Sequence, residues 1–240
     1  GVASPLRDKA PGSIDLVVVR ENTEGEYAPV GGSLYAGTSD EIAIQSNVFT
    51  RKGTERIIRY SFELARKRGK KRKVTSVTKS NAQRHSMVFW DAVFAEVVKG
   101  YPDIQTESLL VDAACMNLVR RPEGFEVLVA SNLFGDILSD IAAVVTGSMG
   151  LAPSGNIDPE RRFPSMFEPV HGSAPDIAGK GIANPLAAIV SAAMMLEHLG
   201  EPAAALAVQG AVERLLVQGG PFTPDLGGKA TTAEVGEAVL

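Results

Sequence analysis

The sequence has little cysteine and little histidine, with one cysteine, Cys115, and three histidines among 240 residues. A single cysteine cannot form an intramolecular disulfide, and the first residues lack the charged, apolar and small-residue order of a signal peptide. We therefore expect a protein of the reducing cytoplasm. No apolar run approaches the length needed to span a bilayer, so the sequence predicts no membrane partner.

The sequence also lacks an excess of positive charge, because its formal net charge is -4. Phosphate binding needs a positive field, so this balance argues against a general nucleic-acid partner. The one basic run, Arg66 to Lys73, straddles a predicted helix end at Gly69. Solvated surface with compensation of the helix dipole is the favoured interpretation of this run, and a nucleic-acid patch is the alternative.

Apolar residues make up 45% of the chain, enough for one large core or two modest ones. Apolar bursts alternate with segments of helical period, which is the pattern of βαβ units and predicts the α/β class. The predicted strands are residues 14–19, 41–48, 74–78, 109–111 and 126–130. Helices are predicted over 51–68, 87–99 and 186–199, with Thr50 as a cap and Gly69 as a stop for the first, and Asn184 and Pro185 beginning the last.

Two aspartates in the segment SNLFGDILSD stand four residues apart, so on a helix Asp136 and Asp140 project from one face. Adjacent carboxylates repel unless a cation neutralises them, and oxygen ligands suit a hard ion such as Mg²⁺ or Mn²⁺. A solvated acidic face is the alternative. The apolar residues around the pair weaken that alternative, as does a third carboxylate, Asp112, at the end of an apolar strand, where α/β sites gather.

Three further polar side chains are predicted at strand ends. Arg20 and Tyr27 belong to the segment RENTEGEY, directly after the strand at 14–19. Arg20 can offer a two-pronged donor set to a carboxylate, and Tyr27 can offer a phenol for proton transfer. Lys79 has the same kind of position after the strand at 74–78. An ordinary solvated surface residue is the alternative in each case.

The segment EPVHGSAPDIAGKGIAN, residues 168–184, is rich in glycine and proline, which permits close backbone approach to a ligand. It lacks the GxGxxG pattern, so a conventional Rossmann phosphate loop is not supported. From its residue type alone, His171 is a metal ligand, a base, a hydrogen-bonding contact or a structural loop residue.

Taken in order, RENTEGEY, TKSN, VDAACMNLV, SNLFGDILSD and FEPVHGSAPDIAGKGIANP resemble the metal-dependent decarboxylating dehydrogenases of the isocitrate and isopropylmalate dehydrogenase family. The resemblance covers almost the whole chain. RENTEGEY with TKSN looks most like the tartrate and D-malate dehydrogenase branch, because isopropylmalate enzymes usually have a Leu-Thr-Gly-Gly type sequence where this chain has Asn22 to Gly25.

The resemblance implies roles for these residues. Arg20 would bind the substrate carboxylate with Tyr27 and Lys79, which would also move protons; Asp112, Asp136 and Asp140 would hold Mg²⁺ or Mn²⁺, with Asp112 also counted as catalytic. Cofactor contacts are implied for Glu168, His171, Gly172, Ser173, Ala174, Asp176 and Asn184. The carboxylate of Asp176 would repel a 2′-phosphate, so NAD is expected rather than NADP.

The resemblance also implies a homodimer, with Lys79 and Asp112 reaching into the partner subunit's site. The expected fold is the two-domain isopropylmalate-dehydrogenase-like fold, with residues 1–146 as a small dimerising domain and residues 147–240 as the C-terminal half of a larger cofactor-binding domain. The family normally has about a hundred further residues before this point, a size that approaches a domain. We therefore expect residues 1–240 alone to be insoluble or inactive.

The expected activity is NAD- and metal-dependent oxidation, with decarboxylation, of a small 2-hydroxy dicarboxylic acid, D-malate or tartrate. Oxidation of 3-isopropylmalate or isocitrate is the closer alternative. A non-catalytic regulatory subunit is the more distant alternative, and it should have lost part of the machinery. Here Arg20, Tyr27, Lys79 and all three aspartates are present.

Overall fold

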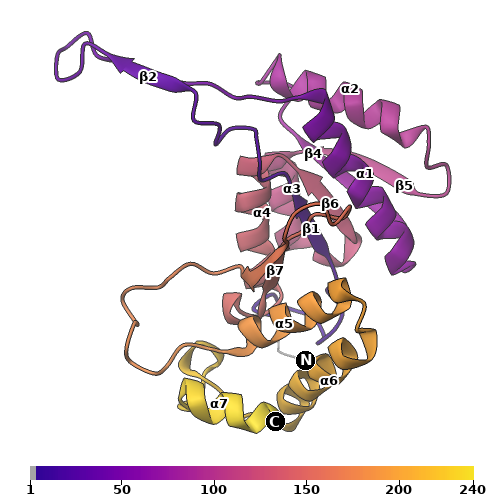
Figure 1. Ribbon diagram of the computed structural model, residues 1–240, viewed down its shortest axis with the longest axis vertical. Helices are drawn as coiled ribbons and strands as arrows, with labels where there is room; N and C mark the ends of the chain where they lie inside the picture. The colour runs from indigo at the N-terminus through magenta and orange to yellow at the C-terminus, as the bar shows by residue number, and fades with distance from the viewer. Residues whose placement is uncertain (1–3) are drawn as a thin grey trace. The chain divides into compact units, whose positions relative to one another are not determined.

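The computed structural model describes residues 4–240, which form two compact units (Figure 1). Residues 15–142 make one unit, called here the sheet unit. Residues 4–14 and 143–240 make the other, called here the helical unit. The predicted roles of 1–146 as a dimerising domain and of 147–240 as a cofactor-binding half-domain stay predictions.

The sheet unit is built on a four-stranded sheet of order β1-β6-β4-β5 in which every pair is parallel, which confirms the α/β class. Its strands are β1 (Val17–Arg20), β4 (Lys73–Thr78), β5 (Gln105–Leu110) and β6 (Val127–Ala130). The short strand β6 has all four residues buried. Its residue Val127 pairs with Val17 on one side and with Val74 on the other, so β6 is an inner strand of the sheet.

Four helices belong to this part of the chain: α1 (Arg51–Arg68), α2 (Ser86–Val98), α3 (Val111–Arg120) and α4 (Asn132–Val145). A 3₁₀ turn, η1 (Pro122–Gly124), precedes β6. Helix α1 begins and ends as predicted, because the Thr50 side chain accepts a hydrogen bond from Gly53 N and Gly69 has a left-handed φ of 64°. The helix predicted over 87–99 is also confirmed, as α2, and it packs into the core: Trp90 is fully buried, and its indole N–H donates to Ser76 Oγ at 3.0 Å.

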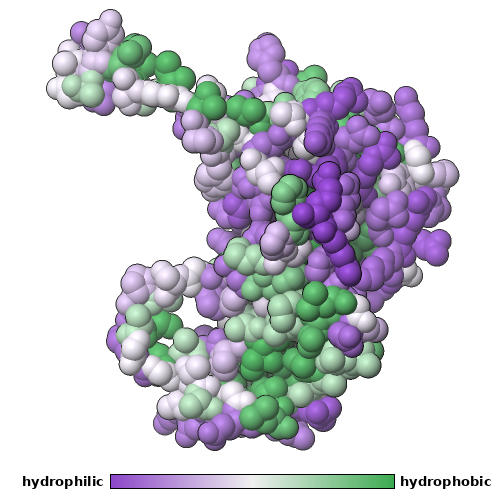
Figure 2. Space-filling view, viewed as in Figure 1, coloured by the Kyte–Doolittle hydropathy of each residue, from purple (hydrophilic) through white to green (hydrophobic). Residues whose placement is uncertain are grey.

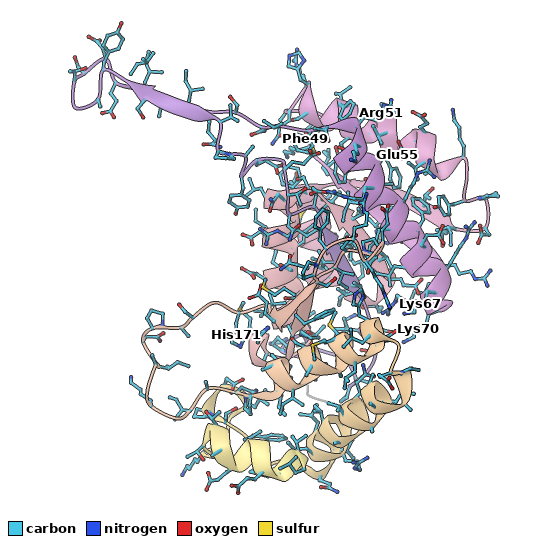
Figure 3. All side chains as sticks on the ribbon, viewed as in Figure 1. Phe49, Arg51, Glu55, Lys67, Lys70 and His171 are labelled. Carbon is cyan, nitrogen blue, oxygen red and sulfur yellow. The ribbon has the colours of Figure 1, made fainter. Side chains whose placement is uncertain are left out.

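The basic run at the end of α1, where Figure 3 labels Lys67 and Lys70, is largely paired within the sheet unit. Arg68 and Lys70 both pair with Asp15. Lys71 Nζ donates to backbone carbonyls, and Lys73 pairs with Glu107 at 2.7 Å. Much of the charge of this run is therefore compensated by acidic groups and carbonyls of the same unit.

The predicted strand at 41–48 exists, but it does not join the sheet. It forms β3 (Ile42–Gln45), which pairs antiparallel with β2 (Gly31–Leu34), a strand that the sequence pattern did not indicate. All eight residues are exposed, and the hairpin extends away from the rest of the sheet unit (Figure 1). Its apolar side chains include Leu34, Ile42 and Ile44, each about half exposed, and they give the hairpin its hydrophobic surface in Figure 2.

The helical unit contains an antiparallel pair, β7 (Pro153–Asn156) and β8 (Met166–Pro169), and three helices, α5 (Leu186–Leu199), α6 (Pro202–Gln218) and α7 (Thr232–Val239). Two 3₁₀ turns are η2 (Met149–Leu151) and η3 (Pro224–Leu226). Leu186, Val212, Leu215 and Val235 form its small core. Asn184 precedes α5 and its Oδ1 accepts a hydrogen bond from Leu186 N at 3.0 Å, but the N-cap position is Pro185, one residue later than predicted. Within residues 4–240, no helix is long and apolar enough to cross a membrane.

Candidate active site

The polar residues predicted at strand ends gather at one edge of the sheet unit. Arg20 is the last residue of β1, and Lys79 follows β4 directly. Ser131 connects the end of β6 to Asn132, the first residue of α4. The carboxyl ends of parallel strands lie along the same sheet edge, which is where α/β proteins build their sites.

Arg20, Tyr27 and Asp136 form one hydrogen-bonded cluster. Arg20 Nη1 pairs with Asp136 Oδ1, and the Tyr27 hydroxyl donates to Asp136 Oδ2 at 3.1 Å. The guanidinium carbon of Arg20 also lies 5.7 Å from the centre of the Tyr27 ring. The hydrogen bond to Asp136 raises the pKa of the Tyr27 hydroxyl, with smaller contributions from burial and from the charge of Asp136. Tyr27 is therefore protonated at neutral pH and can act as a proton donor.

Asn132 holds the Arg20 side chain in this cluster, and its role was not predicted. Its Oδ1 accepts hydrogen bonds from Arg20 Nε at 3.0 Å and Nη2 at 2.8 Å. The Arg20 guanidinium thus meets the first turns of α4 through both Asn132 and Asp136. Many buried strands are followed by an asparagine, so the sequence pattern alone does not distinguish Asn132 from an ordinary residue at this position.

Gly135 allows this close approach between β1 and α4. A Cβ at Gly135 would lie 2.6 Å from Arg20 Cγ and 3.2 Å from Arg20 Cα. Glycine inside a helix is destabilising by about 1 kcal/mol relative to alanine, so its presence here needs a packing reason. The stem of Arg20 supplies that reason.

We expect Gly135→Ala to lower the free energy of unfolding by about 1–3 kcal/mol, although alanine is the better helix former, because the new methyl group overlaps the Arg20 stem. Urea unfolding checks this value. The matched control is Gly236→Ala, at a glycine within α7 where a Cβ would meet no atom within 4 Å; it should be neutral or stabilising. A Gly135→Ala protein as stable as the Gly236→Ala protein would contradict the argument.

Lys79 and Asp112 form a second, separate pair. Lys79 Nζ lies 2.7 Å from Asp112 Oδ1, and this hydrogen bond holds the pKa of the Asp112 carboxyl below its usual value. Asp112 was predicted to end a strand, but β5 ends at Leu110 and Asp112 lies in the first turn of α3, where a negative charge is favoured by the helix dipole.

The three predicted metal ligands do not meet within one chain. Among residues 4–240, no three His, Cys, Asp or Glu side chains come together as a group that could hold a metal ion. Asp136 and Asp140 lie one turn apart on α4, as predicted, whereas Asp112 belongs to α3. The three aspartates therefore do not form one ligand group within the described part of a single chain.

Two glutamates of the RENTEGEY loop dock it onto α1. Glu21 is 1% exposed, and its carboxylate accepts hydrogen bonds from Arg56 Nη2 at 3.1 and 3.2 Å. Glu24 accepts from Thr50 N at 2.9 Å and from Thr50 Oγ1 at 2.8 Å, at the start of α1. A Cβ at Gly53 would overlap the Glu24 carboxylate, so this glycine makes room for it.

The predicted cofactor residues all belong to the helical unit. Glu168 lies in β8, and the others lie between β8 and α5. His171 Nδ1 is 2.9 Å from the carbonyl oxygen of Gly172, and His171 is labelled in Figure 3. Ala174 has a φ of 42°, which is unusual for a residue with a side chain. Gly172, Ser173 and Asp176 are exposed.

Asp225 in η3 fixes Asn184, and the sequence analysis did not identify it. Its carboxylate accepts hydrogen bonds from Asn184 Nδ2 at 3.0 Å, Ser148 Oγ at 2.8 Å and Thr223 Oγ1 at 2.5 Å. Burial raises the pKa of the Asp225 carboxyl, but the three hydrogen bonds together hold it below its usual value. Asn184 is thus held on one side by Asp225 and on the other by the start of α5.

This pKa shift predicts a pH-dependent effect of Asp225→Asn. A carboxyl with a lowered pKa in the folded state contributes stability above its unfolded pKa, about 3.9 for aspartate, and the contribution is lost as the pH falls through the folded value. We expect the variant to be less stable than wild type at pH 7 and the difference to shrink at pH below about 4. Urea midpoints of both proteins across this range measure it. A difference that stays constant down to a pH of about 3 would contradict the prediction.

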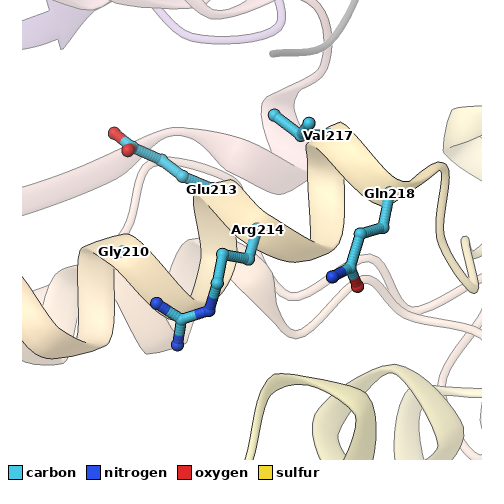
Figure 4. Close-up of a pocket in the computed structure, with 5 residues that line it drawn as sticks. All are labelled: Gly210, Glu213, Arg214, Val217 and Gln218. Atoms are coloured by element: carbon cyan, nitrogen blue, oxygen red, sulfur yellow. The ribbon is translucent and has the colours of Figure 1, made fainter.

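Two hollows of the structure are lined by other residues. One is lined by Asn117, Arg120 and Arg121 at the end of α3. The other lies along α6 and is lined by Gly210, Glu213, Arg214, Val217 and Gln218 (Figure 4). None of the predicted site residues lines either hollow.

Comparison with known proteins gives relatives over the whole chain. The chain is 54% identical over 239 residues to a probable tartrate dehydrogenase/decarboxylase of Agrobacterium vitis and 51% identical over 244 residues to the D-malate dehydrogenase (decarboxylating) of Escherichia coli strain K12. It spans 66% and 67% of the lengths of these relatives. It is also similar to the crystal structure of isocitrate dehydrogenase from Methylococcus capsulatus, with a TM-score of 0.91 and 45% identity over 99% of this chain and 70% of that one.

A family model described as isocitrate/isopropylmalate dehydrogenase matches residues 1–239. This match covers almost every residue, including both predicted site regions. It agrees with the α/β architecture and with the resemblance inferred from the sequence motifs. The chain belongs to the isocitrate/isopropylmalate dehydrogenase family.

Proposed function

We propose that this chain carries the metal and acid-base groups of an NAD-dependent, divalent-metal-dependent enzyme that oxidises and decarboxylates a small 2-hydroxy dicarboxylic acid. The observation that carries the proposal is the cluster of Arg20, Tyr27 and Asp136 at the carboxyl edge of the parallel sheet. It combines a carboxylate-binding cation, a protonated phenol and a hard oxygen ligand within hydrogen-bonding distance of one another.

D-malate or tartrate is the proposed substrate. The relatives that are 51% and 54% identical are named for these two acids, whereas the isocitrate dehydrogenase structure is 45% identical. The difference is small, so 3-isopropylmalate and isocitrate remain the competing substrates. The segment RENTEGEY supports the first pair, because the isopropylmalate type of sequence is replaced at Asn22 to Gly25.

The residues present fit a divalent cation of the Mg²⁺ or Mn²⁺ type. Asp136 and Asp140 offer carboxylate oxygens one turn apart on α4, and the side chain of Asp136 is 42% exposed. Two neighbouring carboxylates on one helix face are destabilising unless a cation compensates them. Asp112 of the partner subunit would be the third ligand.

NAD is the proposed cofactor, held by the segment between Glu168 and Asn184. The fit rests on three observations: the exposure of Gly172 and Ser173, the positive φ of Ala174, and the fixed position of Asn184. Asp176 is exposed, and its carboxylate would repel the 2′-phosphate of NADP.

In this proposal each side chain has a distinct task. Asp136, Asp140 and the partner's Asp112 would hold the divalent cation, which would polarise the 2-hydroxyl and the adjacent carboxylate. The segment between Glu168 and Asn184 would hold NAD, which would supply the hydride acceptor. Arg20 binds a substrate carboxylate through a guanidinium that Asn132 already orients. Tyr27 keeps its proton at neutral pH and delivers it to the substrate carbon that loses CO₂. Lys79, oriented by Asp112, takes part in proton transfer at the 2-hydroxyl of the substrate bound in the partner subunit's site.

A homodimer is part of the proposal. The hairpin of β2 and β3 exposes Leu34, Ile42 and Ile44 on a strand pair that extends away from the sheet, and apolar surface of this kind is typical of an interface. Within one chain, Lys79 and Asp112 do not join Asp136 and Asp140 in one group. In a dimer, a second chain would supply Lys79 and Asp112 and complete the site. Light scattering on the purified protein measures its mass directly.

The proposed function is tested by NADH formation in the protein at its natural full length, with D-malate, the tartrate isomers, 3-isopropylmalate and isocitrate as substrates. We expect the highest kcat/KM with D-malate or a tartrate isomer, loss of activity with EDTA and recovery with Mn²⁺. Highest activity with isocitrate or 3-isopropylmalate would replace the substrate assignment. Activity that persists in EDTA would contradict the metal assignment.

A regulatory subunit without turnover is separated from this proposal by Tyr27→Phe. Removing one hydroxyl oxygen leaves the fold and ligand binding largely intact but removes the proposed proton donor. We expect a loss of about 10²–10⁴-fold in kcat, the usual contribution of a positioned acid-base group. A kcat that is unchanged in Tyr27→Phe would remove Tyr27 from the acid-base role. An unchanged pathway flux in cells that carry the variant would favour the regulatory interpretation.

A further inference from the structure

Glu26 connects the RENTEGEY loop to helix α4. The residue is 8% exposed, and its carboxylate accepts two hydrogen bonds from the start of that helix. Ser131 Oγ donates to Oε1 at 2.7 Å, and Leu133 N donates to Oε2 at 3.1 Å. The donors are 105 and 107 residues away in sequence, so this contact joins two distant segments.

The carboxylate acts as a helix cap supplied from outside the helix. The first N–H groups of a helix have no partner within it, and the positive end of the helix dipole attracts a carboxylate. Glu26 satisfies both requirements at Leu133. Since the two bonds use both carboxylate oxygens, they fix the position and the rotation of the Glu26 side chain.

The two preceding residues strengthen this contact. Asn132 Nδ2 donates to the carbonyl oxygen of Glu24 at 3.1 Å. Gly25 has a φ of 100°, and a Cβ there would lie 3.2 Å from Asn132 Cβ. Three consecutive loop residues therefore rest on the first turn of α4.

Tyr27 is the next residue in the loop, and Asp136 is one turn further along α4. The distance between the Tyr27 hydroxyl and Asp136 Oδ2, 3.1 Å, therefore depends on how the loop is docked on the helix. Tyr27 is 53% exposed, so packing around its ring holds it only in part. Glu26, the residue before it, supplies a buried constraint on its position.

We propose that Glu26 is a positioning residue: by capping α4 from the neighbouring loop, its buried carboxylate sets the distance and direction between the Tyr27 hydroxyl and the Asp136 carboxylate. The inference rests on the proposed function for its catalytic consequence, because Tyr27 is the proton donor there. Its geometric content, a Tyr27 position that depends on Glu26, is independent of any reaction.

The test compares Glu26→Ala, Glu26→Gln and Glu26→Asp in the protein at its natural full length. We expect Glu26→Ala to lower kcat about 10–100-fold with less than about a threefold change in KM for NAD, because a misplacement near 1 Å costs about that much in rate. Glutamine can accept from Leu133 N and donate to Ser131 Oγ, so Glu26→Gln should restore kcat to within about threefold. Aspartate keeps the charge but is one methylene short, so it should resemble alanine and serves if the alanine variant does not fold.

Glu24→Ala is the matched control. Glu24 lies in the same loop and also caps a helix, but its carboxylate contacts Thr50 at the start of α1 and not α4. A merely structural effect of losing a capping glutamate would appear equally in both alanine variants. Equal kcat values for Glu24→Ala and Glu26→Ala would overturn the proposal.

A second measurement requires no turnover. Protein labelled with 3-fluorotyrosine gives a ¹⁹F signal from each tyrosine, and Tyr27→Phe identifies the one from Tyr27. We expect this signal to move in Glu26→Ala and Glu26→Asp and to keep its position in Glu26→Gln and Glu24→Ala. An unmoved signal in Glu26→Ala would overturn the inference. If wild type converts none of the tested acids, the proposed function fails, and the ¹⁹F spectra still decide the role of Glu26.

Discussion

Replacing Asp136 with asparagine will reduce kcat by at least about a thousandfold, which corresponds to about 4 kcal/mol of transition-state stabilisation. Asparagine has the same shape, and its amide oxygen can still accept from Arg20 Nη1, so the fold should remain intact. It lacks the negative charge that a divalent cation needs. We expect the affinity for Mn²⁺, measured by the electron paramagnetic resonance of the free ion, to fall about 100-fold or more, the upper end of the effects of groups around metal sites.

Asp103→Asn is the control for this experiment. Asp103 also pairs with an arginine, Arg66, and that hydrogen bond holds the pKa of its carboxyl below the usual value, but Asp103 lies outside the proposed site. Its variant should bind Mn²⁺ and turn over substrate within about twofold of wild type, since exposed ion pairs contribute at most about 1 kcal/mol. An Asp136→Asn protein that retained wild-type Mn²⁺ affinity would remove Asp136 from the metal site.

Two inactive variants will restore activity to each other when their subunits are mixed. In the proposed dimer, each site takes Arg20 and Asp136 from one chain and Lys79 and Asp112 from the other. A heterodimer of Arg20→Ala and Lys79→Ala therefore has one intact site and one site with both changes. Random mixing of equal amounts should give about a quarter of wild-type activity, because half of the dimers are mixed and each has one working site of two.

The control mixes Lys79→Ala with Asp112→Asn, which lie in the same half-site. Neither site of that heterodimer is intact, so we expect no recovery. Subunits are exchanged by unfolding and refolding the mixture, and NADH formation is measured afterwards. Absence of recovery in the first mixture, with dimers present by light scattering, would mean that each site is complete within one chain.

The regular part of the fold could be predicted because local signals and burial agree there. Helix α1 has a capping Thr50, an apolar face at Ile58 and Phe62, and a left-handed Gly69 at its end, and the structure has all of them. The all-buried strand β6 likewise follows from an uninterrupted apolar run. In both elements the sequence pattern and the packing require the same conformation.

The hairpin could be predicted only in part because its partner is not another element of the sheet. The alternation at Ile42 and Ile44 indicates a strand, but it does not say what that strand pairs with. Its partner β2 contains Gly31, Gly32 and Ser33, which have little intrinsic preference for strands. The apolar side chains that make the pattern visible are exposed in the single chain.

The sequence indicated the candidate reacting groups of the site but not the residues that hold them in position. Arg20 and Lys79 could be placed because parallel strands present their ends at one edge. Asn132, Glu26 and Asp225 were missed, because each acts through a contact with a segment distant in sequence. A single sequence contains no signal for such contacts.

The eight residues of the RENTEGEY loop include some that anchor the loop and others that contact Asp136. The carboxylates of Glu21, Glu24 and Glu26 bind Arg56, the start of α1 and the start of α4, whereas Arg20 and Tyr27 reach Asp136. In a saturation-mutagenesis library of this loop, substitutions of the three glutamates should therefore be depleted by selection for folding alone, even in cells that never meet the substrate. The three glutamates of the segment thus anchor the loop, and substitutions at its other positions can change the substrate preference while the anchoring contacts remain.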